Sequence, residues 1–354
     1  PNLWLKRGGE IIRNAPRPLI EDLDTLPPPD REVFPYSNSF DLNFLKRGVF
    51  MASRGCPFNC SYCCSPAMKR MYGGEKYIRF RSVGNLIEEV ERITKDFPQI
   101  EYHVFHDDLL PMNKSWFAEF TKQYSRRIKK PFEMNCHPNL MDKDIAIMAR
   151  SAGCALIRFG IESGNEEIRR DILDRHMPNQ RIRDAFRCCD EVDIKTLSYN
   201  MVGLPHETRT QILDTIKMNA AVNPRVIHVS IFYPYPGTRA FERCRQEGLL
   251  TDKFIDSYYE DSVLEQPSIS TDQVRAMKDR FEPLVRSYSR CRDVPAPLDK
   301  LGEVLIDLGV LATTDRRVLK VMSKLPRRKA DSKRLSGGTC YAVHGGEVRV
   351  WEKK

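Results

Sequence analysis

The sequence of 354 residues contains no long hydrophobic run and no secretion signal. No apolar stretch approaches the roughly 18 residues that a membrane-spanning helix needs. The first residues, PNLWLKRGGEIIRN, have neither the basic start nor the apolar stretch of a signal peptide. We therefore expect no membrane span and a cytoplasmic location. With 41% apolar and 30% charged residues, the composition excludes a wholly disordered chain.

Cysteines are absent before Cys56 and then gather in one place. The total of eleven is odd, and four of the eleven fall between Cys56 and Cys64. This distribution argues against a disulfide framework, because such frameworks pair an even number of spaced cysteines in secreted chains. A tight cluster in a reducing compartment indicates metal ligation or catalysis.

The net charge of +9 is confined to the end of the chain. From Arg316 to Lys354 there are twelve Lys or Arg and three Asp or Glu, so the remainder is close to neutral. Such a tail can contact nucleic acid or a membrane surface electrostatically. A solvated basic terminus is the favoured interpretation, and nucleic acid is not an expected partner.

Strands alternate with amphipathic helices through the middle of the sequence. We predict strands at 48–53, 102–106, 132–136, 155–161, 196–202 and 226–233. Helices are expected at 85–97, 115–128, 143–152, 165–173, 181–192, 207–222 and 238–248. Six successive βα units predict an α/β fold with a parallel sheet, built as a partial (β/α)6 TIM-like barrel.

The two ends have other patterns. Residues 1–15 predict a β-hairpin that turns at Gly8 and Gly9, and the proline-rich stretch 16–35 predicts an extended connector. Beyond the barrel we expect helices at 272–288 and 300–309, then a hairpin at 341–351. The predicted domains are therefore a hairpin and connector at 1–40, a barrel at 41–250 and a helical region with a basic tail at 251–354.

The loop SRGCPFNCSYCC follows the first strand of the predicted barrel. It places Cys56, Cys60 and Cys63 at the end of that strand, where such folds carry chemistry. Three thiolates within eight residues suit one face of an iron–sulfur cluster and leave one iron open. A structural zinc site needs four ligands, and no second cysteine or histidine pair follows at the required spacing. We do not expect Cys64 to be a ligand.

This loop, followed by six βα units, resembles the radical S-adenosylmethionine (SAM) superfamily over residues 48–240. The resemblance implies a four-iron, four-sulfur (4Fe-4S) cluster held by Cys56, Cys60 and Cys63. It implies that SAM binds the open iron through its amino and carboxylate groups. One electron then cleaves SAM to methionine and a 5′-deoxyadenosyl radical.

The resemblance also implies roles for residues at the ends of later strands. Asp107 or Asp108 would bind the methionine ammonium group, and we place Asp107 first because Asp108 could equally lie in a solvated turn. Glu162 would meet the ribose hydroxyls or amino group, with Ser163 beside it. The wall around adenine and substrate would comprise Asn200, Gly203, Tyr235 and Gly237. His176 and His206 are interpreted as ordinary histidines.

The connector and the FHDD, FGIESG and YPYPGT segments look like the cobalamin-associated class of the superfamily. No D-x-H-x-x-G loop for cobalamin occurs in the sequence, and the chain starts with Pro1 rather than Met. We therefore expect the cobalamin domain to be missing from this chain, either because it lies upstream of Pro1 or because the protein has lost it. Methylthiotransferases, which need three cysteines before the loop, and maturases with auxiliary clusters are disfavoured.

The expected function is reductive cleavage of SAM for methyl transfer to carbon or other radical chemistry. The substrate would be a small molecule or a peptide, and an electron donor such as flavodoxin or ferredoxin would be a partner. The alternative is a non-catalytic iron–sulfur or zinc-binding module that uses its basic tail for nucleic acid.

Overall fold

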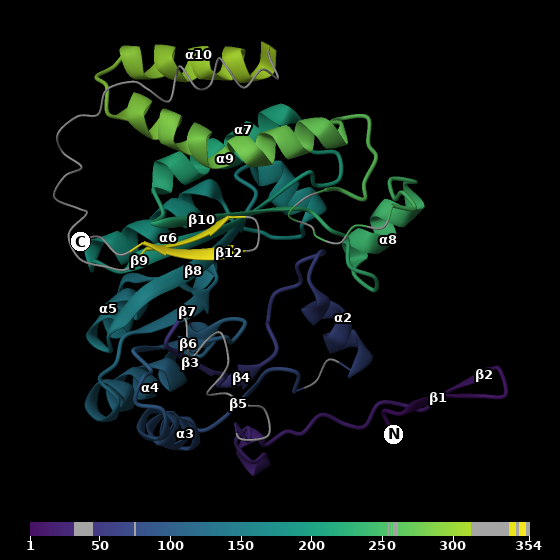
Figure 1. Cartoon of the computed structure of the whole chain (residues 1–354), viewed down its shortest axis with the longest axis vertical. Helices are drawn as coiled ribbons and strands as arrows, with labels where there is room; N and C mark the ends of the chain where they lie inside the picture. Colours follow the sequence, from purple (N-terminus) through teal and green to yellow (C-terminus); the bar gives the residue numbers. More distant parts are fainter. Residues whose placement is uncertain are drawn as a thin grey trace.

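Six parallel strands form the central sheet of the protein, whose computed structural model describes residues 1–31, 45–73, 76–253, 255, 257, 259, 261–312, 340–344 and 347–351. The strand order is β10, β9, β8, β7, β6 and β3, and every neighbouring pair is parallel. The bounds are β3 (Arg47–Phe50), β6 (Tyr102–Phe105), β7 (Phe132–Cys136), β8 (Cys154–Glu162), β9 (Lys195–Val202) and β10 (Val226–Ile231). All six lie where the sequence predicts them. The expected α/β class and open, partial barrel are confirmed (Figure 1).

Helices that alternate with the strands cover one face of the sheet. They are α3 (Val83–Asp96), α4 (Lys114–Arg127), α5 (Lys143–Ser151), α6 (Asn179–Glu191) and α7 (Arg209–Val222). A further helix, α8 (Arg239–Gln246), follows β10 and packs against the loops at the strand ends (Figure 1). Five of these helices start at polar caps, Ser82, Asn113, Asp142, Thr208 and Thr238, whose side chains accept a backbone N–H of the first turn. Buried aromatic rings join helices to strands, as where Phe105 meets Phe120 edge-on at 5.1 Å. The capping residues and the buried residues together explain why the predicted helix ranges are close to the observed ones.

The opposite face of the sheet is less covered. Along β9, buried residues alternate with the half-buried Leu197, Tyr199 and Met201. The buried set faces the helices, because the side chain of Asn200 bonds Asn219 of α7. Parallel sheets are normally buried on both faces. The half-buried inner face therefore borders an accessible interior.

Some local elements differ from the sequence prediction. The expected helix at 165–173 is a π-helical turn, Ile168–Ile172. The helix α2 (Cys64–Met71) and the short pair β4 (Ser53–Arg54) and β5 (Arg79–Phe80) were not predicted. Within the described ranges, three 3-10 turns were also not predicted, namely Leu23–Thr25, Leu110–Met112 and Pro138–Leu140. Both α2 and β4 adjoin the cysteine loop, which has too few residues for a periodic pattern.

The helices α9 (Thr271–Arg292) and α10 (Leu298–Ala312) confirm the predicted helical C-terminal region. Phe281 of α9 shares a buried core with Ile216 of α7 and Ile231 of β10. The helices therefore pack directly on the barrel, as Figure 1 shows. The division of the chain at residue 250 remains a prediction.

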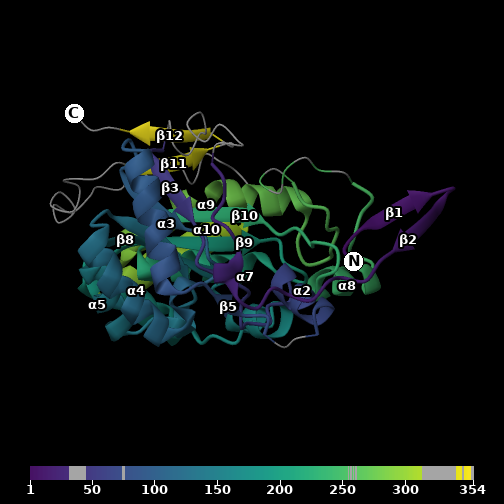
Figure 2. The same cartoon turned by 90° about the horizontal axis from the view of Figure 1, so that it is seen from below.

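The terminal hairpins are present as expected. β1 (Trp4–Arg7) pairs antiparallel with β2 (Glu10–Arg13), and β11 (Cys340–His344) pairs with β12 (Glu347–Trp351). Figures 1 and 2 both show the first hairpin projecting away from the barrel. Within the described residues, no helix combines the length and apolar character needed to cross a bilayer. The basic stretch 316–339 and part of the connector lie outside the described residues.

Candidate functional site

The cysteine loop is anchored to distant parts of the chain. The backbone N–H of Ser61 donates to the carbonyl of Leu173 at 2.8 Å, and the Ser61 hydroxyl donates to that of Ile172 at 2.6 Å. The N–H of Ala240 at the start of α8 donates to the Ser61 carbonyl at 3.0 Å. Gly55 has a φ of +91°, and a Cβ there would lie 2.6 Å from the carbonyl oxygen of Tyr77. These contacts hold the loop at the C-terminal end of β3.

The three predicted ligands are all free thiols. Cys60 is buried, Cys56 and Cys63 are half-buried, and Cys64 is exposed. Burial raises the pKa of Cys56 to about 11 and that of Cys63 to about 12. The neighbouring thiols contribute to both shifts, so the group is close enough to interact electrostatically. A positively charged metal centre would favour the thiolates that ligation requires.

The thiols suit a cluster better than a single ion. Among the residues that the structure describes, no three His, Cys, Asp or Glu side chains converge on a position for one metal ion. A 4Fe-4S cluster needs no such convergence, because each thiolate can bind a different iron. The donor set therefore fits the cluster, and the described residues provide no four-ligand zinc site of the kind that the alternative function requires.

Arg175 is a site residue that the sequence analysis missed. Its side chain donates from Nη1 to the Sγ of Cys60 at 3.5 Å and from Nη2 to the carbonyl oxygen of Gly160 at 2.6 Å. Arg175 is 7% exposed, and its Nε has no hydrogen-bond partner among the described residues. A buried guanidinium with an unused donor beside Cys60 can bind an anionic group. No motif marks Arg175, because its partners are distant in sequence.

Glu162 lies on the other side of Arg175. Its backbone has a φ of +66°, and the pairing of β8 with β9 shifts between Gly160 and Glu162. Tyr62 of the cysteine loop donates a hydrogen bond to the Glu162 carboxylate. Burial raises the pKa of Glu162, and the positive charge of Arg175 partly opposes the increase. A bulge and a positive φ at one residue are features that cluster at functional sites.

Asp107 and Asp108 have different environments. The fully buried Asp107 accepts the backbone N–H of Ala52 at 3.0 Å and the hydroxyl of Ser53, so its carboxylate ties β6 to the cysteine loop. Asp108 is exposed, and its charge contributes to the raised pKa of Cys56. Asp108 is therefore the more accessible of the two carboxylates, and the binding of an ammonium group by either one remains a prediction.

The remaining predicted residues surround the site less directly. Ser163 is buried beside Thr215 of α7, and the Asn200 side chain also faces α7, away from the inner face of the sheet. Gly203 has a φ of +78°, and a Cβ there would lie 2.8 Å from Val274. Tyr235 is 50% exposed, and Gly237 has open space around it. Their proposed contacts with adenine and substrate remain predictions.

Both singled-out histidines have acidic partners. The Nε2 of His176 lies 2.8 Å from the Oδ1 of Asp174, and the Nε2 of His206 lies 2.6 Å from the Oε2 of Glu247. These contacts agree with the interpretation of both residues as ordinary histidines.

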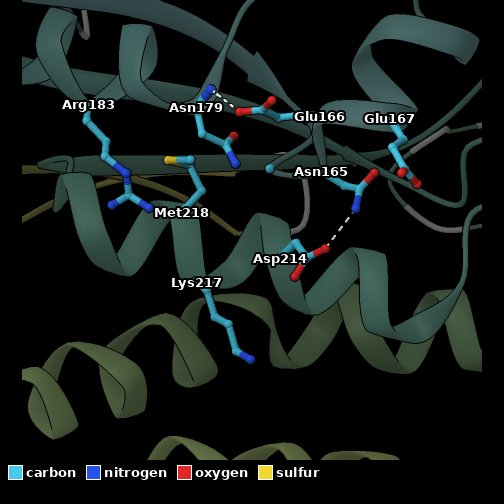
Figure 3. Close-up of a pocket in the computed structure, with 9 residues that line it drawn as sticks. Asn165, Glu166, Glu167, Asn179, Arg183, Asp214, Lys217 and Met218 are labelled. Atoms are coloured by element: carbon cyan, nitrogen blue, oxygen red, sulfur yellow. Dashed lines mark hydrogen bonds between the residues drawn. The ribbon is translucent and has the colours of Figure 1, made fainter. Parts of the chain in front are cut away.

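A cavity of about 480 Å³ lies apart from the cysteine loop. Figure 3 shows charged and amide side chains around it, with Asn165 bonded to Asp214 at 2.9 Å and Asn179 bonded through its backbone to Glu166. Its lining residues are Gly164, Asn165, Glu166, Glu167, Asn179, Arg183, Asp214, Lys217 and Met218. It contains none of the predicted ligands.

Comparisons with known proteins point to one superfamily. Residues 51–218 match the family described as the Radical SAM superfamily. The chain is 30% identical over 253 residues to an uncharacterized methyltransferase of Pyrococcus horikoshii. The aligned region covers 70% of this chain and 52% of that protein. It is 26% identical to the anaerobic magnesium-protoporphyrin IX monomethyl ester cyclase of Cereibacter sphaeroides, over 68% of this chain and 39% of that protein. The chain thus spans about half, or less, of these relatives.

Solved structures share the fold. The cobalamin-dependent SAM radical enzyme OxsB, with aqua-cobalamin and SAM bound, aligns with a TM-score of 0.59 at 12% identity, covering 90% of this chain and 54% of that one. The radical SAM methyltransferase TsrM from Kitasatospora setae, with cobalamin and a 4Fe-4S cluster bound, aligns with a TM-score of 0.51 at 17% identity. This alignment covers 67% of this chain and 46% of that one. These likenesses support the partial-barrel architecture.

Proposed function

This chain carries a domain of the radical SAM superfamily, and we propose that it binds a 4Fe-4S cluster and reductively cleaves SAM. The observation that carries the proposal is the group of three free thiols, Cys56, Cys60 and Cys63, on one anchored loop at the end of β3. When bound, the cluster supplies the electron that splits SAM into methionine and a 5′-deoxyadenosyl radical. The polypeptide binds and orients the reactants and limits the access of water.

Three charged residues around the loop would orient SAM. The unused Nε of Arg175 suits the methionine carboxylate, and the exposed Asp108 suits the ammonium group. Glu162, held by Tyr62 and Arg175, would accept hydrogen bonds from the ribose hydroxyls. Because these groups come from three separate segments, the site needs the folded barrel rather than the cysteine loop alone.

Methyl transfer to carbon with cobalamin is the reaction that we propose for the whole protein. Several relatives are named as methyltransferases, and two fold neighbours carry cobalamin in their structures. The cobalamin would be held by an upstream domain, joined through the hairpin and connector at 1–40 to the barrel at 41–250. The region 251–354 would be an appendage, and flavodoxin or ferredoxin would deliver the electron.

The ligand assignment is tested by iron content. The protein is reconstituted anaerobically with iron and sulfide, and iron per chain and the visible absorption are measured. We expect about four irons per chain for the wild type, and a loss in Cys56→Ala, Cys60→Ala or Cys63→Ala. Cys64→Ala is the matched control and should retain the wild-type content. Loss of iron in the Cys64 variant alone, or a colourless zinc-loaded protein, would contradict the assignment.

A further inference from the structure

Charged groups lie on the inner face of the sheet, below the cysteine loop. Arg158 of β8 and Glu133 of β7 form a buried ion pair. Arg158 lies two residues before Gly160 on β8, so these two positions are on the same face, and a Cβ at Gly160 would clash with the Oε1 of Glu162. At about 3.3 Å per residue, Arg158 and Gly160 are about 7 Å apart along the strand. The pair therefore lies beneath the proposed SAM site.

Arg158 has an unused hydrogen-bond donor. Its Nη2 binds Glu133, but its Nη1 is buried and has no partner among the described residues. Arg158 is only 7% exposed. A buried N–H group that lacks a partner is unfavourable, and such a group inside a functional interior indicates that a ligand or water completes it. A second cation, Arg47, is close enough to lower the pKa of Glu133, which burial raises overall.

Aromatic and polar side chains lie near the ion pair and Glu162 on the inner face. Tyr199 is half-buried there, and the charges of Arg158, Glu133 and Glu162 all act on its phenol. The ring of His228 on β10 meets that of Tyr199 edge-on at 5.4 Å. Tyr259 bonds the Nε2 of His228 at 2.9 Å. Burial lowers the pKa of His228, and its ring also meets that of Tyr259 edge-on.

We propose that this layer is an anchoring site for a substrate that carries a carboxylate. The Nη1 of Arg158 would donate to the carboxylate, and the body of the substrate would lie against Tyr199 and His228 toward the cysteine loop. A cationic group is disfavoured, because the Glu133 carboxylate is already paired and Arg47 adds positive charge. This proposal rests on the proposed function in one respect, because the bound acid is a substrate only if SAM is cleaved above it.

Benzoate and benzamide test the site as an isosteric pair, one anionic and one neutral. Their affinities for the full, reconstituted chain are measured by saturation-transfer NMR titration. We expect the wild type to bind benzoate at least tenfold more tightly. The double variant Arg158→Gln with Glu133→Gln removes both charges without leaving a buried carboxylate unpaired, and it should lose the preference. Arg183→Gln, in the outer cavity, is the matched control and should retain it.

Arg158→Lys provides a second readout if the double variant does not fold. It keeps the charge and the ion pair but removes the planar guanidinium, so the preference should fall without disappearing. Equal affinities of the wild type for benzoate and benzamide, or an unchanged preference in both variants, would overturn the site. Reductive cleavage of SAM is measured in the same preparations. Cleavage without a benzoate preference refutes this site alone, and a preference without cleavage refutes only the proposed function.

Discussion

Arg175 donates a hydrogen bond to the Sγ of Cys60 at 3.5 Å, although 115 residues separate the two. The same guanidinium binds the carbonyl oxygen of Gly160 and lies beside the Glu162 carboxylate. Arg175 therefore links the cysteine loop to the end of β8. One buried cation thus connects the cysteine loop with two of the segments that form the proposed SAM site, its own and that of Glu162.

Replacing Arg175 should weaken SAM binding while leaving the cluster in place. Arg175→Gln keeps much of the side-chain volume but removes the charge opposite the SAM carboxylate. A hydrogen bond to a charged group contributes about 1.5–3 kcal/mol, so we expect SAM affinity to fall by roughly 10- to 150-fold. Isothermal titration of the reconstituted protein measures this affinity. Arg170→Gln, an exposed arginine paired with Asp171, is the control, and equal affinities in the two variants would refute the role.

The two aspartates should respond oppositely to replacement by asparagine. Asp108→Asn should lower SAM affinity, because the carboxylate facing the ammonium group is lost, without changing the melting temperature. Asp107→Asn should destabilise the fold, because an amide group would face the N–H of Ala52 in a buried position, at about 1–3 kcal/mol. SAM titration and thermal denaturation of both variants distinguish the roles. Lower affinity with unchanged stability in the Asp107 variant would restore the original assignment.

Gly160 and Gly164, which lie on either side of the bulge at the end of β8, distinguish effects on SAM binding from effects on folding. A Cβ at Gly160 would lie 2.3 Å from the Oε1 of Glu162 and 3.1 Å from the Nη2 of Arg175, both on side chains that can move. Gly160→Ala should therefore lower SAM affinity at least tenfold with little loss of stability. A Cβ at Gly164 would lie 2.3 Å from the backbone oxygen of Asp214, so Gly164→Ala should mainly lower the melting temperature.

The control for both glycines is Gly309→Ala in α10, where the Cβ meets open space. We expect it to stabilise the protein by about 0.5–1 kcal/mol through helix propensity. Unchanged SAM affinity in Gly160→Ala would show that Glu162 and Arg175 do not act at the SAM site.

Glu207 should make stability depend on pH. Burial raises its pKa to about 8, although the N–H groups of Gly203 and Leu204 donate to it. An unfolded glutamate titrates near pH 4.3, so between about pH 4.3 and 8 the folded protein holds one more proton than the unfolded chain. Its contribution to stability therefore falls as pH rises through this window, by up to about 1.4 kcal/mol per unit.

Urea unfolding at about pH 5, 6.5 and 8 measures this contribution. Glu207→Gln stays uncharged, so the variant should gain stability relative to the wild type as the pH rises. Glu265→Gln, at an exposed position, is the control and should follow the wild type. Parallel curves for the wild type and the Glu207 variant would show that Glu207 does not carry the buried proton.

The sequence predicted the strands and most helices because their patterns are local. In β9, the alternation of apolar and polar residues defines both the strand and its two faces. The same alternation could have placed Asn200 with Ser198 and Val202 on the face toward α7. The predicted contact of Asn200 with the site rests instead on its position at the strand end and remains a prediction.

The missed features depend on distant contacts. Arg175 becomes recognisable only when the π-helical turn places it beside Cys60. Asp107 and Asp108 are adjacent in sequence, so only the backbone path after β6 decides which one turns toward Ala52. The Arg158 and Glu133 pair requires the register of β7 against β8. A single sequence contains none of these relationships explicitly.

The most direct test of the central claim is the formation of 5′-deoxyadenosine from SAM. The anaerobically reconstituted protein is mixed with SAM and dithionite, and the product is measured by liquid chromatography and mass spectrometry. We predict product from the wild type and from Cys64→Ala, and none above background from Cys63→Ala. An iron-loaded wild type that forms no 5′-deoxyadenosine, or a Cys63 variant that forms as much as the wild type, would contradict the account.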